Sequence, residues 1–109
     1  MHLISVVIIT LNEEKNISAC IDSVKKIADE IIVLDSFSTD RTTAIARRKG
    51  AIVEQKRFTG YIQQKNAANA LASNNYILSL DADEVLDESL VNSILAAKAG
   101  VMADAYVMN

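Results

Sequence analysis

Residues 3–14 read LISVVIITLNEE, a nearly unbroken apolar run that ends abruptly in polar and acidic side chains. A strand with one face in water alternates apolar and polar side chains, whereas a strand covered on both faces is apolar throughout. This run therefore predicts a buried strand of a parallel sheet over residues 3–9. Because no basic region precedes the run and two glutamates follow it closely, it is not typical of a signal peptide.

Similar apolar runs recur along the chain, separated by helical patterns. Further strands are predicted at residues 30–35, 51–55, 76–80 and 104–108. The first predicted helix begins at Glu13 and is capped by Asn12, and the second is capped by Ser38 or Thr39, runs to Arg48 and closes at Gly50. The third spans residues 61–73, and the fourth is capped by Asp87. This alternation indicates an α/β domain with a Rossmann-like, doubly wound, mainly parallel sheet in three α/β/α layers. Such sheets bind ligands beyond the carboxyl ends of their strands.

The composition narrows the class of protein further. The 109 residues are half apolar and carry a net charge of −3, with acids and bases interspersed. This fits one globular domain or part of one, without an electrostatic footprint for nucleic acid. No apolar run approaches the roughly 20 residues of a membrane span. Cys20 is the single cysteine, expected in the core on the inner face of the first helix, so the chain forms no internal disulfide and a reducing compartment, the cytoplasm, is expected.

The run at residues 76–80 ends in DADE, which brings Asp81 and Asp83 close together. In extended backbone, side chains two residues apart point the same way, so both carboxylates can reach one spot. Like charges at such a distance raise each other's proton affinity unless a cation neutralises them. Oxygen ligands suit Mg²⁺ or Mn²⁺, with water and substrate phosphates completing the shell. The structural alternative is that Asp81 starts a turn and that Asp83, Glu84 or Asp87 caps the next helix.

Polar side chains at the other strand ends are expected to meet this pair. Thr10, Asn12 and Glu13 follow the first strand, and Asp35 ends the second. A carboxylate such as Asp35 can accept the imide hydrogen of a uracil, and hydroxyl or amide groups near Thr10 can hold a ribose. Lys65, on a predicted helix, is by itself typical of solvated surface.

Three side chains after Asp35 have a simpler interpretation. Ser38, Thr39 and Asp40 are residue types that cap helices, and this role is favoured over ligand binding. We expect them to fix the loop that carries Asp35.

Four ordered motifs together carry a resemblance to a known family. VVIITLNEE, IIVLDSFSTDRT, GYIQQKNAA and YILSLDADE, at residues 6–14, 31–42, 60–68 and 76–84, resemble the donor-binding half of family-2 glycosyltransferases with the GT-A fold. The lipopolysaccharide-core glucosyltransferase-like branch is the most similar. The resemblance covers nearly the whole chain and implies that residues 1–109 are the nucleotide-sugar-binding part of a longer domain, cut before its acceptor-binding half.

The resemblance assigns roles to individual residues. It implies that Thr10, Leu11 and Asn12 line the nucleoside pocket with Glu13 beside it, that Asp35 hydrogen bonds the base, and that Lys65 reaches the nucleotide. At the metal, it implies that Asp81 faces the ribose or the metal's waters and that Asp83 ligates Mn²⁺ or Mg²⁺. Glu84 is implied to orient the loop. The chain departs from the commoner pattern at Ile9 and Leu11, where proline and tyrosine are usual. It also departs at Ser36 and Phe37, where a second aspartate and a glycine are usual.

The implied reaction is transfer of a hexose, with inversion, from a nucleotide-diphosphate sugar, such as a uridine diphosphate sugar, to a glycan or lipid-linked acceptor. The implied location is the cytoplasm, at the inner face of the membrane. Inversion requires a carboxylate base, which the family takes from its later half. Asp104 comes too early and is interpreted as the start of a strand, so we expect these residues to bind donor without turnover.

Two alternatives remain at the level of sequence. LDADEVL also fits the nucleophile motif of haloacid-dehalogenase-like phosphatases, with Asp81 as the nucleophile and Asp83 as the acid and base. In that class, however, the motif follows the first strand, whereas here it follows the fourth. The other alternative is a non-catalytic nucleotide-binding or assembly module that forms a homodimer through an exposed strand at residues 104–108.

Overall fold

The computed structural model of the chain describes residues 2–99, which form a sheet of four parallel strands between helices. The strands are β1 (Ile4–Thr10), β2 (Glu30–Asp35), β3 (Ile52–Gln55) and β4 (Tyr76–Asp81). The helices are α1 (Ile17–Val24), α2 (Thr42–Arg48), α3 (Tyr61–Ala70) and α4 (Glu88–Ala99). Four of the predicted strands are confirmed, and the fifth, at residues 104–108, lies outside the described residues together with Asp104.

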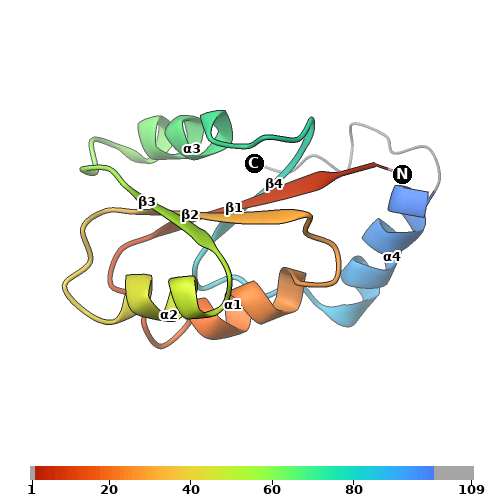
Figure 1. Ribbon diagram of the computed structural model, residues 1–109, viewed down its shortest axis with the longest axis horizontal. Coiled ribbons are helices and arrows are strands. Elements are labelled where there is room, and N and C mark those ends of the chain that lie inside the picture. The colour runs from red at the N-terminus through yellow and green to blue at the C-terminus, as the bar shows by residue number, and fades with distance from the viewer. Residues whose placement is uncertain (1, 100–109) are drawn as a thin grey trace.

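The order of the strands in the sheet is β3-β2-β1-β4. The chain therefore builds outward from β1 through β2 to β3 and then returns to place β4 on the other side of β1. The strand order therefore reverses at β1, and doubly wound sheets bind ligands at the carboxyl ends of the strands beside such a switch point. The carboxyl ends of β1 and β2 lie toward the left of Figure 1.

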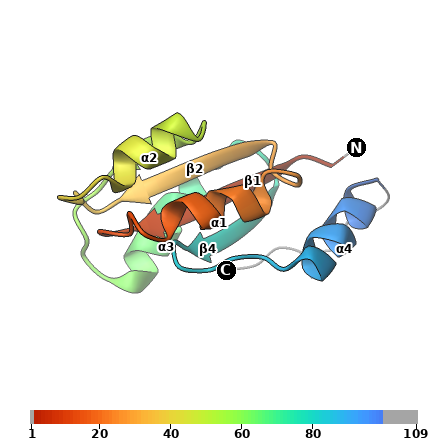
Figure 2. The ribbon, with the colours of Figure 1, turned by 90° about the horizontal axis from the view of Figure 1, so that it is seen from below.

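Helices cover both faces of the sheet, as the unbroken apolar strands predict (Figures 1 and 2). Alternate side chains of β1 point to opposite faces. Ile4, Val6 and Ile8 join the cluster under α1, α2 and α4, whereas Val7 and Ile9 join a smaller cluster under α3. The predicted three-layer α/β/α architecture is therefore confirmed.

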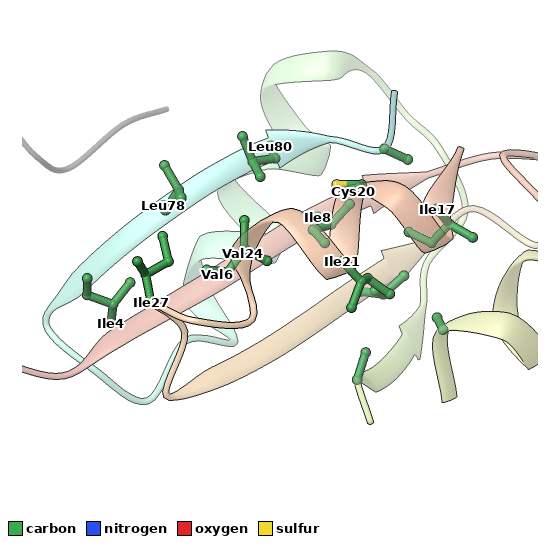
Figure 3. Packing of buried hydrophobic residues seen from close by; sticks show 14 of the residues in the cluster. Ile4, Val6, Ile8, Ile17, Cys20, Ile21, Val24, Ile27, Leu78 and Leu80 are labelled. Atoms are coloured by element: carbon green, nitrogen blue, oxygen red, sulfur yellow. The ribbon is translucent and has the colours of Figure 1, made fainter. Parts of the chain in front are cut away.

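The larger cluster is organised by α1. Figure 3 shows four buried side chains of this helix packed over β1, near Val6 and Ile8, namely Ile17, Cys20, Ile21 and Val24. The predicted core position of Cys20 is confirmed. Burial raises the pKa of its thiol to about 12, and nearby carboxylates, Glu84 foremost, add to the increase. The thiol is therefore protonated and unreactive in the folded protein.

The helix ends confirm some predicted caps and correct others. Gly50, with φ +91°, follows α2 as a C-terminal glycine, and the Asp87 carboxylate accepts the Leu90 N–H at 2.7 Å in the first turn of α4. The predicted cap of the first helix by Asn12 is wrong. The residue has φ +53°, and α1 begins later, at Ile17. The third helix ends at Ala70, three residues earlier than predicted.

Candidate functional site

A cleft lies beyond the carboxyl ends of β1, β2 and β4, at the point where the strand order reverses. It has a volume of about 280 Å³. Its walls come from the ends of the three strands and from α3 and the segment before it, and they are formed by Ile9, Thr10, Leu11, Glu13, Ser36, Phe58, Tyr61, Gln64, Asp81, Ala82 and Asp83. The structure thus brings together five of the predicted site residues, Thr10, Leu11, Glu13, Asp81 and Asp83.

The β4 end of the cleft is acidic. Asp81 is the last residue of β4, and its backbone N–H donates to the Glu84 carboxylate at 2.7 Å, so Glu84 holds the turn that presents Asp81 and Asp83. Burial raises the pKa of the Asp81 carboxyl, although Lys65 acts to lower it. Negative charge nearby adds to the increase, chiefly from Glu84 and then from Asp83 and Glu13.

One atom at this end lacks a partner. Asp81 Oδ1 is buried and accepts no hydrogen bond from the described residues. A buried carboxylate oxygen without a donor is costly unless a ligand supplies the missing positive charge. Glu84, Asp83 and Glu13 add negative charge around this carboxylate, and Lys65 opposes them, so a cation bound in the cleft would relieve the remaining repulsion.

The available ligands suit a hard divalent metal ion. Within residues 2–99, no group of three or more His, Cys, Asp and Glu side chains could hold a metal ion. Asp81 and Asp83 together supply oxygen atoms alone, which Mg²⁺ and Mn²⁺ prefer to nitrogen or sulfur. A site with few protein ligands is typical of metal ions that bind through water and substrate phosphates.

Asp35 does not line the cleft, although it was predicted to contact the base. Its side chain is 0% exposed, and it forms a cluster with Thr10, Ser38 and Gln55, here called the Asp35 cluster. Oδ1 accepts the Thr10 and Ser38 hydroxyls at 2.6 Å each. Oδ2 accepts the Ser38 N–H at 2.8 Å and Gln55 Nε2 at 3.3 Å. In this arrangement Asp35 ties together β1, β3 and the loop after β2.

Asn12 also acts within the loops and does not line the cleft. Its Oδ1 accepts the Thr39 N–H at 2.8 Å, and its own N–H donates to Ser38 Oγ at 2.7 Å. Ser38 and Thr39 are therefore engaged with the first loop and do not cap α2, which corrects that prediction. Asp40 Oδ1 instead accepts the Thr42 N–H at 2.9 Å. The predicted fixing of the loop that carries Asp35 is confirmed for Ser38.

Lys65 lies outside the cleft walls but close enough for its charge to act on Asp81. It is half-buried on α3. The structure therefore places one basic group near the acidic end of the cleft, without showing a direct contact.

Six residues of the cleft wall were not among the predicted site residues, namely Ile9, Ser36, Phe58, Tyr61, Gln64 and Ala82. Phe58 and Tyr61 form an edge-to-face pair with ring centroids 6.1 Å apart. The charge of Asp81 is the main cause that raises the pKa of Tyr61, which places this phenol beside the acidic end. Gln64 left no clear signal in the sequence, and only the structure shows that it shares the buried face of α3 with Ala68, four residues later.

Fold and cleft together describe an α/β domain with a partly acidic cleft at the switch point of its sheet. Residues 5–109 match glycosyl transferase family 2, and the chain belongs to this family. A glycosyltransferase of Rickettsia felis is 47% identical over 107 residues, which cover 98% of this chain and 38% of the relative. The lipopolysaccharide core biosynthesis glycosyltransferase LpsC of Rhizobium meliloti is 38% identical over 92 residues, or 80% of this chain and 34% of LpsC.

Solved structures of glucosyl-3-phosphoglycerate synthase from Mycobacterium tuberculosis share the fold. One of them has a TM-score of 0.74 and 30% identity, and the match covers 93% of this chain and 42% of the synthase. Other structures of that enzyme contain uridine diphosphate with Mn²⁺ or with Mg²⁺. The GT-A fold predicted from the sequence is confirmed, and the phosphatase alternative is set aside because the family is that of glycosyltransferases. The chain spans well under half of the relatives it matches.

No helix within residues 2–99 is long and apolar enough to cross a membrane.

Proposed function

We propose that this chain is the donor-binding part of a metal-dependent, inverting hexosyltransferase that uses a uridine diphosphate sugar. The observation that carries the proposal is the buried, unpartnered Asp81 Oδ1 in an acidic cleft that Asp83 also lines. That cleft lies where α/β sheets of this topology bind nucleotides. The similar structures of glucosyl-3-phosphoglycerate synthase, which contain uridine diphosphate with Mn²⁺ or Mg²⁺, support a uridine diphosphate sugar as donor and a divalent metal ion as cofactor.

The two ends of the cleft suit different parts of the donor. Asp83, which is exposed, and Asp81 would hold the divalent ion against the two phosphates. The ion would supply positive charge that stabilises the leaving diphosphate. Thr10 and Leu11 line the cleft at the end of β1, where the ribose would lie, with Glu13 beside them.

Three further residues would act less directly. Asn12 and Asp35 would stabilise the loops that carry the cleft wall. Asn12 accepts a hydrogen bond from Thr39 in the loop after β2, and Asp35 accepts one from Thr10 at the end of β1. Lys65 lies near Asp81 and would balance part of the negative charge of the donor's phosphates.

The acceptor and the catalytic base belong to our proposal as well. An inverting transfer needs a carboxylate that removes the proton of the acceptor hydroxyl, and we assign that base to a part of the full-length protein beyond residue 109. This chain would then bind donor without turnover. The similarity to LpsC supports a glycan or lipid-linked acceptor, and with it a place at the cytoplasmic face of the membrane.

Isothermal titration calorimetry with uridine diphosphate, in the presence and absence of Mn²⁺, tests the proposal. We expect Mn²⁺ to tighten binding at least about tenfold, or about 1.4 kcal/mol. Asp83→Asn should remove this dependence on the metal, because one of the two carboxylates at the acidic end loses its charge. Glu54→Gln, which changes an exposed carboxylate on β3, is the matched control and should bind like the unmodified chain. Equal metal dependence in Asp83→Asn would contradict the proposal.

A further inference from the structure

Gln64 is a buried amide in the wall of the cleft, at the end away from the carboxylate pair. Its side chain is 1% exposed. The Nε2 group donates to Ser36 Oγ at 3.1 Å, whereas Oε1 is buried and accepts no hydrogen bond from the described residues. A buried carbonyl oxygen without a donor is unfavourable. A ligand in the cleft that carries an N–H group would satisfy it.

The location of Gln64 in the sheet suits the base of a nucleotide. Ser36 follows β2, Asp81 ends β4, and β1 lies between these two strands. Two strand spacings separate the two ends of the cleft by about 10 Å. A nucleoside diphosphate with its phosphates at β4 would therefore cross β1 with its ribose and reach Ser36 and Gln64 with its base.

A second observation concerns the rest of this wall, which α3 and the segment before it line with aromatic rings between Gln64 and the acidic end. Phe58 and Tyr61 line the cleft as an edge-to-face pair and are both exposed. Tyr61 precedes Gln64 by three residues on α3, so the two side chains share one face of the helix. Aromatic rings next to a hydrogen-bonding amide are typical of sites that stack a base and bind its polar edge.

Asp35 is poorly placed for the same task. Both of its carboxylate oxygens already accept hydrogen bonds within the Asp35 cluster, and its side chain is fully buried. A contact with the base would require Asp35 to lose one of these bonds. Gln64 Oε1 is free to accept a bond without such a loss.

We propose that Gln64 determines base selectivity, with its Oε1 accepting the N3–H of uracil while Ser36 holds its Nε2. The proposal rests on the proposed function and adds a residue that distinguishes one nucleotide from another. Cytosine presents an unprotonated N3, so its acceptor would face the Gln64 acceptor. The cleft therefore selects uracil over cytosine.

Calorimetry with Mn²⁺ and a set of nucleoside diphosphates tests this assignment. For the unmodified chain we expect cytidine diphosphate, and uridine diphosphate methylated at N3, to bind at least about tenfold more weakly than uridine diphosphate. In Gln64→Met the preference for uridine over cytidine diphosphate should fall to less than about twofold. Gln63→Met, an exposed neighbour on α3, is the matched control and should keep the preference.

A second variant tests the role of Ser36 without changing the glutamine. Ser36→Ala frees Nε2, so the amide can rotate and present its donor to the cleft. This variant should also lose preference for uridine diphosphate, and cytidine diphosphate should bind more tightly than it does to the unmodified chain. Thermal melting without nucleotide shows that each variant is folded.

The results separate the possible failures. If uridine diphosphate binds with metal dependence but Gln64→Met and Ser36→Ala keep the full preference over cytidine diphosphate, the assignment of Gln64 is wrong and the proposed function stands. If Gln64→Met weakens binding of uridine diphosphate but leaves the affinity for 2′-deoxyuridine diphosphate unchanged, Oε1 binds the ribose. That result also overturns the assignment. If the unmodified chain binds N3-methylated uridine diphosphate as tightly as the parent nucleotide, the proposal fails without recourse to any variant. No binding of uridine diphosphate with Mn²⁺ would instead overturn the proposed function.

Discussion

Replacing Asp35 by alanine should destabilise the fold far more than it weakens binding of nucleotide. The substitution removes the acceptor of the Thr10 hydroxyl and of the Ser38 hydroxyl and N–H, at 2.6, 2.6 and 2.8 Å. Each buried donor left without a partner costs about 1–3 kcal/mol. Thr10 is buried, whereas Ser38 is half-buried and water can reach it, so part of the cost is recovered. We expect a total loss of about 3 kcal/mol in the free energy of unfolding.

Urea denaturation followed by circular dichroism measures this loss. The comparison requires that the slope of the free energy of unfolding against urea concentration is the same in both proteins. In a domain of this size the loss should lower the melting temperature by roughly 10–20 °C. Asp35→Asn should cost less than alanine, because its amide retains one oxygen acceptor and the two hydroxyls can accept from its nitrogen. Glu54→Ala, an exposed acid on β3, is the control and should change the free energy of unfolding by about 0.5 kcal/mol or less.

A loss below about 1 kcal/mol in Asp35→Ala would refute the argument, because the cluster would then contribute little to stability. Weaker binding of uridine diphosphate at unchanged stability would be a different contradiction. That result would mean that Asp35 contacts the nucleotide directly, as the family resemblance implies, and that the cluster opens when ligand binds.

Two further predictions follow from the shifted pKa values. Asp81→Asn should raise the melting temperature of the metal-free protein at neutral pH. The pKa of the Asp81 carboxyl is raised in the folded protein, so the folded state binds the proton more tightly than the unfolded chain does. The free energy of unfolding therefore falls as the pH rises from the pKa of the unfolded chain through the pKa of the folded protein. The advantage of Asp81→Asn should therefore vanish in acid, and melting curves over a pH series check this; an advantage that persists in acid would contradict it. Cys20, with its pKa raised to about 12, should resist iodoacetamide at neutral pH until urea unfolds the chain. Mass spectrometry measures the labelling, and rapid labelling of the native protein would contradict the prediction by showing that the core opens.

Much of the fold could be predicted because it depends on local patterns. The apolar run at residues 30–35 predicts a strand with the same bounds as β2, and the run at residues 76–80 predicts β4 to within one residue. Gly50 and Asp87 were found because left-handed backbone favours glycine and a helix N-terminus favours a short acidic side chain. Asp81 and Asp83 were expected in one cleft because they follow a buried strand.

The order of the strands depended on tertiary structure. The sequence predicted a doubly wound sheet, but the position of β4 beside β1 is set by packing between residues far apart in the chain. That neighbourhood determines which strand ends share the cleft. The pairing of Thr10 with Asp35 and of Asp35 with Gln55 likewise turned a carboxylate expected at the rim into a buried acceptor.

Gln64 shows the same division most clearly. Its helix has little apolar periodicity, so the sequence alone indicates an exposed polar face around Lys65 and no special role for its neighbour. Packing of α3 over the sheet buries this amide and leaves one of its two polar ends bonded to Ser36. The sequence by itself determined which segments are strands and helices and which acids follow them, because those features depend on neighbours in the chain. Tertiary structure decided which polar groups are satisfied internally and which remain for a ligand, because burial and hydrogen bonding depend on residues brought together from several elements.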